Sequence, residues 1–177
     1  MGLRPAKTYR DAKKVSWARY SRRRPRKSFV KSMPHNALSQ FVMGNSKANY
    51  EAVAELVAGK KVLIRDNALE SSRQAVNKYL EKSLPNNYCF RVLVFPHNVI
   101  RENKMIAGAG ADRLQSGMAH PYGKPSERGA MIKSRQTIFT IEFNAKDLKH
   151  VAEAFRRGKG KLGKDLEVVL RELNPAS

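Results

Sequence analysis

Residues 137–158 read TIFTIEFNAKDLKHVAEAFRRG, and this stretch predicts a strand followed directly by a helix. The first part, 137–143, is short and rich in β-branched and aromatic residues, as strands are. The second part, 144–158, has apolar residues at i, i+3, i+4 and i+7: Leu148, Val151, Ala152 and Phe155. We expect Asn144 to cap the start of this helix and Gly158 to supply the left-handed residue at its end.

Working outward, further short segments share the character of the strand at 137–143. They are rich in Val, Ile and Phe and bounded by Gly, Asn or Pro, and they lie at 37–43, 53–58, 61–65, 88–95, 98–101, 130–133 and 166–170. The segment at 51–58, EAVAELVA, also fits a helix because Ala and Glu favour helices. Its alternation and the GKK turn that follows favour a strand.

A second helix is predicted over residues 66–83, where Leu69, Val76 and Leu80 share one face and Ala68, Ala75 and Tyr79 lie beside it. Asn67 followed by Glu70 resembles a capping box. Two helices among about eight strands, without regular alternation, indicate an α+β fold, a two-layer sandwich with a largely antiparallel sheet. At 177 residues we expect one domain, with a basic N-terminal extension at 1–36 and a globular core at 37–177.

The charge of the chain implies a polyanionic partner. Its formal net charge is +20, more than solubility requires, so the candidates are nucleic acid, an anionic membrane surface or an acidic protein. No apolar run approaches a membrane span, and the start of the chain has no signal-peptide core, so we expect a soluble cytosolic protein. Cys89 fits a buried apolar residue, and the histidines lack metal-ligand spacing, so neither a metal nor a cofactor is expected.

The positive charge is concentrated at the N-terminus, where residues 1–35 hold 12 Lys and Arg against one acidic residue. Aromatic residues interleave with these cations, a combination suited to neutralising RNA phosphates and stacking on unpaired bases. The alternative is a solvated basic tail or a localisation patch. The RNA contacts predicted here are Arg4, Lys7, Arg10, Lys13, Lys14, Trp17, Arg19, Arg22, Arg23, Arg24, Arg26 and Lys27.

The run GKGKLGKD at 158–165 matches the spacing of a dinucleotide-binding motif and nearly that of a phosphate loop. Both motifs require a preceding strand and a following helix, whereas this run follows a predicted helix and leads to a strand. Asp165 also stands where Ser or Thr would bind magnesium. We therefore expect a basic loop against RNA phosphates, or alternatively a solvated turn, with Arg156, Arg157, Lys159, Lys161 and Lys164.

The segment at 102–125 has no usable periodicity, and loops of such length in compact domains are usually functional or disordered. An enzyme could use Asp112 here as a base, because it is the only acidic residue between 103 and 125. A single carboxylate beside Arg113 is more often an ion-pair or turn residue. No Ser, His and Asp arrangement can be argued from the sequence, so we expect no enzymatic activity.

Three runs carry a resemblance to a known family: VIRENKM at 99–105, GADRLQSGM at 110–118 and YGKP at 122–125. Together with the start MGLRPAKTYR, they resemble the archaeal and eukaryotic large-subunit ribosomal protein ten-e family, the counterpart of bacterial large-subunit protein sixteen. The resemblance covers essentially the whole chain. Ala119 stands where the family commonly has a basic residue.

The resemblance implies a structural ribonucleoprotein component of the large ribosomal subunit, with a sandwich of the α/β-hammerhead type. Its expected partners are large-subunit rRNA near the central protuberance and the tRNA entry cleft, nearby 5S rRNA, tRNA and other large-subunit proteins. No membrane partner and no homo-oligomer are expected. An RNA-modifying enzyme or an assembly factor acting on rRNA is the alternative.

The resemblance also directs the long loop toward tRNA at the peptidyl transferase region. The residues implied to lie near tRNA are Met105, Ile106, Ala107, Gly108, Ala109, Gly110, Ala111 and Asp112. The rRNA contacts predicted in and around the loop are Arg101, Lys104, Arg113, Lys124 and Arg128.

Overall fold

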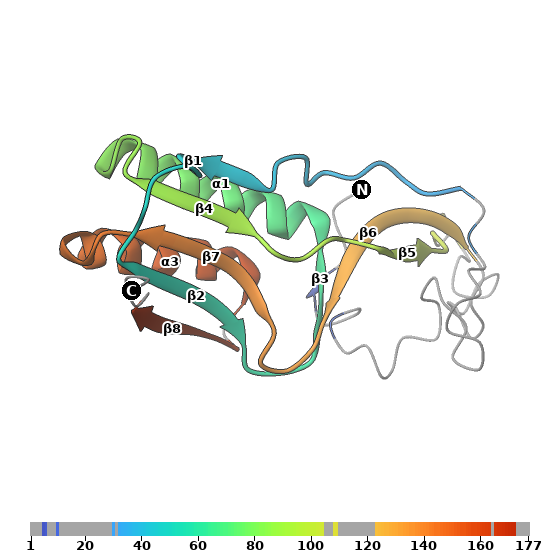
Figure 1. The fold of residues 1–177 in the computed structure, drawn as a ribbon. Helices are drawn as coiled ribbons and strands as arrows, with labels where there is room; N and C mark the ends of the chain where they lie inside the picture. Colours follow the sequence, from blue (N-terminus) through green and yellow to red (C-terminus); the bar gives the residue numbers. More distant parts are fainter. Residues whose placement is uncertain are drawn as a thin grey trace.

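The computed structural model describes residues 5, 6, 10, 30, 32–104, 108, 109, 123–163 and 165–172. These residues form a five-stranded sheet, a three-stranded sheet and two long helices (Figure 1). Every strand pair is antiparallel, so the predicted α+β class with two helices and antiparallel strands is confirmed. The strands are divided between two sheets.

The larger sheet has the strand order β1-β4-β7-β2-β8. Its strands are β1 (Val42–Gly44), β4 (Tyr88–Val92), β7 (Thr137–Phe143), β2 (Ala52–Ala58) and β8 (Leu166–Glu172). The stretch at 137–143 therefore forms the central strand of this sheet. Phe139 of β7 meets Phe90 of β4 edge to face, with ring centroids 5.3 Å apart.

Strand β2 confirms the strand prediction for the segment that also fitted a helix. Its burial alternates, because Ala54, Leu56 and Ala58 enter the core. Leu56 lies opposite Phe139 in the register with β7, so the two strands bury one common face. Period-2 alternation thus outweighs the helix propensity of Ala and Glu. Cys89 of β4 is fully buried, as predicted, and burial raises the pKa of its thiol.

Two helices cover the same face of the larger sheet: α1 (Asp66–Ser83) and α3 (Leu148–Leu162), which follows a short 3-10 turn, η2 (Ala145–Asp147). Figure 1 shows them side by side behind the sheet. The predicted face of α1 is confirmed, since Leu69, Val76 and Leu80 are fully buried. Within the described residues, no helix is long and apolar enough to cross a membrane.

The predicted end of the second helix is wrong, because α3 runs through Gly158 to Leu162. The residue with positive φ at its end is Gly163, at 128°. The buried face is also shifted: Val151, Ala154, Phe155, Gly158 and Leu162 are buried, while Leu148 and Ala152 are exposed. Gly158 therefore packs inside the helix layer, and the tertiary contact described below explains its presence there.

Both predicted helix caps are also wrong. No side chain caps either start. Helix α1 begins at Asp66, whose two carboxylate oxygens accept hydrogen bonds from the backbone N–H groups of Asn67 and Ala37. Glu70 pairs with Arg73 rather than returning to Asn67. Asn144 makes no side-chain cap, and the N–H of the next residue donates to a glutamate outside the helix.

The smaller sheet has the order β3-β6-β5, formed by β3 (Val62–Arg65), β6 (Lys124–Ile132) and β5 (Asn98–Glu102). The strand predicted at 130–133 is only the end of β6, so the strand is longer and the connection from β5 is shorter than expected, 103–123. The predicted strand at 37–43 forms a ladder only from Val42 onward. Strand β6 pairs with β3 on one side and with β5 on the other. This pairing makes a strand of its polar segment KPSERG, although the sequence of that segment does not predict one.

Helices α1 and α3 pack tightly against each other at Gly158. A Cβ atom there would lie 2.5 Å from Cγ2 of Val76 and 3.1 Å from Oγ of Ser72. The hydroxyl of Ser72, itself fully buried, donates a hydrogen bond of 2.9 Å to the carbonyl oxygen of Gly158. The helices thus depend on a residue without a side chain at this crossing.

We expect Gly158→Ala to lower the free energy of unfolding by about 1–2 kcal/mol, because overpacking outweighs the gain in helix propensity. Gly160→Ala is the matched control, since nothing lies within 4 Å of a Cβ at that position of the same helix. The control should leave stability unchanged or raise it by up to about 1 kcal/mol. Urea unfolding of both variants measures the difference, and equal stabilisation by the two substitutions would contradict the packing argument.

Candidate nucleic-acid interface

Strands β5 and β6 form an antiparallel hairpin that carries the long loop, 103–123, at its end. Glu102 lies opposite Lys124, and Arg101 lies opposite Pro125. The register shifts between Ile100 and Arg101, which is the signature of a β-bulge. We call this end of the hairpin, Arg101–Lys104 with Gly123–Ser126, the loop stem.

Gly123 allows the two sides of the loop stem to close. Its φ is +109°, a conformation that residues with a side chain rarely adopt. A Cβ there would lie 2.9 Å from both the carbonyl carbon and the carbonyl oxygen of Glu102. Neither atom can move without displacing strand β5, so position 123 requires glycine.

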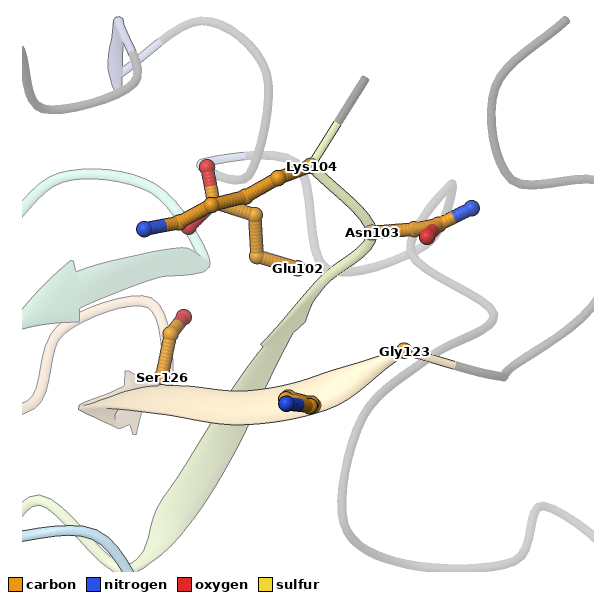
Figure 2. A pocket seen from close by; sticks show the side chains of 6 residues that line it. Glu102, Asn103, Lys104, Gly123 and Ser126 are labelled. Atoms are coloured by element: carbon orange, nitrogen blue, oxygen red, sulfur yellow. The ribbon is translucent and has the colours of Figure 1, made fainter. Parts of the chain in front are cut away.

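A pocket of about 510 Å³ opens at the loop stem, lined by Glu102, Asn103, Lys104, Gly123, Lys124 and Ser126. Lys104 and Lys124 are both exposed. Figure 2 shows the side chains of Glu102 and Lys104 extending over the same side of the strand, whereas Asn103 points to the opposite side. Two exposed ammonium groups beside an open pocket suit the binding of phosphate groups.

A partly buried ion pair between β3 and β6 lies next to the loop stem. Nη1 of Arg65, on β3, donates to both carboxylate oxygens of Glu127, on β6, at 3.1 and 2.8 Å. The Arg65 side chain is 8% exposed, so little water competes for this pair. On the other side of β6, the hydroxyl of Ser126 donates to the carbonyl oxygen of Ile100. Side-chain contacts therefore hold β6 to both neighbouring strands next to the loop stem.

Two arginines predicted to contact RNA contact the protein's own backbone. The first is Arg128 of β6, whose Nε–H donates to the carbonyl oxygen of Pro34 at 2.6 Å. This bond fastens the end of the N-terminal extension to the smaller sheet. Leu38, which follows Pro34 by four residues, is buried in the main core. Arg101, another predicted contact, is half-buried at the loop stem.

The second is Arg10, which joins three parts of the fold. Its Nη2 donates to the carbonyl oxygen of Leu162, the last residue of α3, at 2.9 Å. Its own carbonyl accepts from the N–H of Leu63 on the free edge of β3, at 3.0 Å. A cation bound at a helix C-terminus also interacts favourably with the helix dipole. Gly163, which follows Leu162, has a φ of +128° that a residue with a side chain rarely adopts, and a Cβ there would displace the guanidinium of Arg10.

Helix α3 carries a second group of predicted cations, held by one carboxylate. Nε and Nη2 of Arg156 donate to Glu153 at 2.6 and 2.8 Å, and Nε of Arg157 donates to it at 2.8 Å. Arg156 first and Arg157 second hold the pKa of Glu153 down to about 2. Glu153 therefore stays ionised and offsets part of the positive charge of this helix face.

An aromatic ring from the other helix completes this group. The guanidinium carbon of Arg157 lies 4.3 Å from the ring centroid of Tyr79 on α1. The Tyr79 hydroxyl is 3.5 Å from Nδ1 of His150 on α3, and the two rings lie 6.4 Å apart. Sequence reasoning placed Tyr79 beside the core face of its helix and predicted no partner for it. It missed the meeting of Tyr79 with His150, which depends on how the two helices pack.

The structure does not bring all the predicted cations together. Lys104 and Lys124 belong to the loop stem, which lies apart from the helix layer in Figure 1. Lys159 and Lys161 lie in the last turns of α3, so the prediction of a loop there is wrong. The remaining predicted contacts lie outside the described residues: Arg4, Lys7, Lys13, Lys14, Trp17, Arg19, Arg22, Arg23, Arg24, Arg26, Lys27, Arg113 and Lys164.

Of the residues predicted to lie near tRNA, the structure describes only Gly108 and Ala109, and both are exposed. Met105, Ile106, Ala107, Gly110, Ala111 and Asp112 lie outside the described residues. Among the residues that are described, no group of three or more His, Cys, Asp or Glu is placed to bind a metal ion. The glycine-rich run ends α3 and precedes β8, the reverse of the order that a phosphate loop requires.

Comparison with known proteins identifies relatives of the whole chain. The family model described as ribosomal protein L16p/L10e matches residues 17–169. Large ribosomal subunit protein uL16 of Hyperthermus butylicus is 41% identical over 92% of this chain and 89% of its own length. The protein of the same name from Thermofilum pendens is 38% identical over 97% of this chain and 99% of its own length. The one from Methanococcus maripaludis strain C7 is 39% identical over 96% of this chain and 95% of its own length.

We expect Arg10→Ala to lower the free energy of unfolding by about 1–2 kcal/mol, because it leaves the end of α3 and its carbonyl without the guanidinium. Lys104→Ala is the control, as an exposed cation of the loop stem whose loss should change stability by less than about 0.5 kcal/mol. Thermal and urea unfolding of the RNA-free protein measure both. If Arg10→Ala were as stable as the wild-type protein, the contact with α3 would not stabilise the fold, and Arg10 would be available to an RNA phosphate.

Proposed function

The chain belongs to the ribosomal protein L16p/L10e family, and on that premise we propose that it is a structural constituent of the large ribosomal subunit in the cytoplasm. The observation that carries this proposal is the extent of the match. It spans residues 17–169, which include both sheets and both helices. Relatives named as large-subunit proteins also match over more than nine-tenths of the chain.

Large-subunit rRNA is the proposed main partner. The net charge of +20 requires a polyanion, and 12 of the 35 basic residues lie in residues 1–35. Arg10 fastens this extension to α3 and β3, and Arg128 fastens it again at Pro34. The cations between these two attachments lie outside the described residues, and we propose that they contact rRNA phosphates. Other large-subunit proteins and 5S rRNA are proposed as neighbours.

The finer position that we propose is near the central protuberance, at the tRNA entry cleft, with loop 103–123 directed toward tRNA at the peptidyl transferase region. The loop stem supports this proposal, because Gly123 and the Arg65–Glu127 pair fix the direction in which the loop leaves the protein. Lys104 and Lys124 supply exposed positive charge at that point. The described residues of the loop, Gly108 and Ala109, are small enough for close approach of the backbone to nucleic acid.

The alternative, an RNA-modifying enzyme or an assembly factor, finds less support. Its proposed base, Asp112, lies outside the described residues. Family membership favours a structural role, since the matching family is one of ribosomal proteins. Positioning by charge and shape accounts for the observed features without a chemical step.

Sedimentation through sucrose tests the proposed function. The protein should remain with large subunits through washes at moderate salt, whereas an enzyme or assembly factor would be released. The variant with Arg22→Gln, Arg23→Gln, Arg24→Gln and Arg26→Gln keeps the Arg10 attachment and should be released at lower salt, because four lost cations weaken its attraction to rRNA phosphates. Each lost phosphate contact should also reduce the magnitude of the slope of log affinity against log salt by about 0.7–0.9. Complete release of the wild-type protein by these washes would overturn the assignment.

Shortening the loop by deleting residues 104–110 should spare folding and most rRNA binding. The deletion removes one predicted rRNA contact, Lys104, but leaves the Arg65–Glu127 ion pair and the N-terminal extension in place. Large subunits reconstituted with this protein should bind tRNA in the aminoacyl position more weakly and form peptide bonds more slowly. Filter binding of aminoacyl-tRNA and a puromycin assay measure the two effects. Wild-type values in both assays would exclude a role of the loop tip in tRNA placement.

A further inference from the structure

We propose that the exposed surface where α1 and α3 run side by side binds an unpaired RNA base, which stacks on the guanidinium plane of Arg157. This inference rests on the proposed function, because rRNA would be the source of the base. We call Tyr79, His150, Glu153 and Arg157 the helix-face site. Its residues belong to α1 and α3, whereas the loop stem belongs to β5 and β6.

The guanidinium of Arg157 is fixed on two sides before any ligand arrives. Its carbon lies 4.3 Å from the centroid of the Tyr79 ring, which supports one face of the plane. Its Nε–H donates to Oε1 of Glu153 at 2.8 Å, which restrains the edge. An arginine held in this way loses little further conformational entropy on binding.

Part of the Arg157 side chain remains accessible to a ligand. Its side chain is 50% exposed although Tyr79 covers one side of the guanidinium and Glu153 occupies Nε–H. A phosphate at Nε–H of Arg157 would compete with the Glu153 carboxylate, which also accepts hydrogen bonds from Arg156. A nucleobase that stacks on the plane leaves these hydrogen bonds intact, and arginine planes are known stacking partners of unpaired bases.

The surroundings of the site provide groups for the rest of a nucleotide. His150 is exposed and its Nδ1 lies 3.5 Å from the Tyr79 hydroxyl, so imidazole and hydroxyl together offer donors and acceptors beside the stacked base. Lys82 follows Tyr79 by three residues on α1, and Lys161 follows Arg157 by four on α3. Because such spacings place side chains on the same helix face, these exposed lysines flank the site and can contact phosphates.

The choice of a single-stranded segment follows from the stacking geometry. In an RNA duplex the bases are stacked on one another, and their faces are closed to a protein side chain. A purely electrostatic site would accept a duplex, or an acidic protein, as readily as a single strand. Selectivity for unpaired bases is therefore the property that separates stacking from attraction between charges.

The test compares Arg157→Lys with the wild-type protein, since lysine keeps the charge and loses the plane. The probes are a single-stranded RNA of about 12 nucleotides, a duplex of similar length and polyglutamate, with fluorescence anisotropy as the readout. We expect Arg157→Lys to weaken single-strand binding about 10-fold at an unchanged salt slope, and to leave duplex and polyglutamate binding within about 2-fold. Tyr79→Phe, which keeps the ring, should keep most of the single-strand affinity.

Arg156→Lys is the matched control, because Arg156 shares the Glu153 carboxylate and, within the part of the chain that the structure describes, stacks on no aromatic ring. It should bind all three probes like the wild type, and circular dichroism establishes that each variant is folded. Wild-type single-strand affinity in Arg157→Lys, or an equal loss with the duplex, would overturn the stacking site. If Arg157→Lys weakened the binding of polyglutamate, the site would be assigned to an acidic protein instead. None of these results bears on sedimentation with large subunits, which tests the proposed function separately.

Discussion

The absence of a side chain at Gly158 is the constraint on which the helix layer depends. It lets α3 approach α1 until the backbone carbonyl of Gly158 accepts a hydrogen bond from the buried hydroxyl of Ser72. At this distance, Val76 of α1 and Phe155 of α3 are both fully buried over the larger sheet. The same approach sets Tyr79 beneath Arg157 on the outer surface. One glycine thus determines both the packing of the core and the shape of the surface above it.

A second theme is the internal use of cations in a chain with a large positive charge. Arg10 binds the end of α3, Arg65 binds Glu127 beneath the loop stem, and Arg128 binds the backbone of the extension. These guanidinium groups are at least partly shielded from water, where hydrogen bonds to charged groups are strongest. Part of the basic composition therefore builds the protein, and the net charge alone overstates the number of side chains available to RNA.

The predicted RNA contacts that are described and exposed lie in separate places with different geometry. At the loop stem, Lys104 and Lys124 are flexible ammonium groups beside an open pocket. On the helix face, Arg157 is held between an aromatic ring and a carboxylate. The first arrangement suits phosphates and tolerates adjustment, whereas the second favours a planar partner in one orientation. Under the proposed function, the two surfaces would contribute attachment and local specificity respectively.

The sequence by itself determined the α+β class, the strand at 137–143, the buried face of α1 and the family, because these depend on local periodicity and on contiguous motifs. It could not determine the end of α3 or the role of Gly158, since a glycine in an isolated helix suggests a terminus and only contact with Ser72 and Val76 makes it an interior residue. The length of β6 was also hidden, because KPSERG has no strand pattern and is ordered by the strands on either side. The roles of Arg10 and Arg157 were decided by partners at distances of 152 and 78 residues along the chain, and no local pattern encodes such pairings.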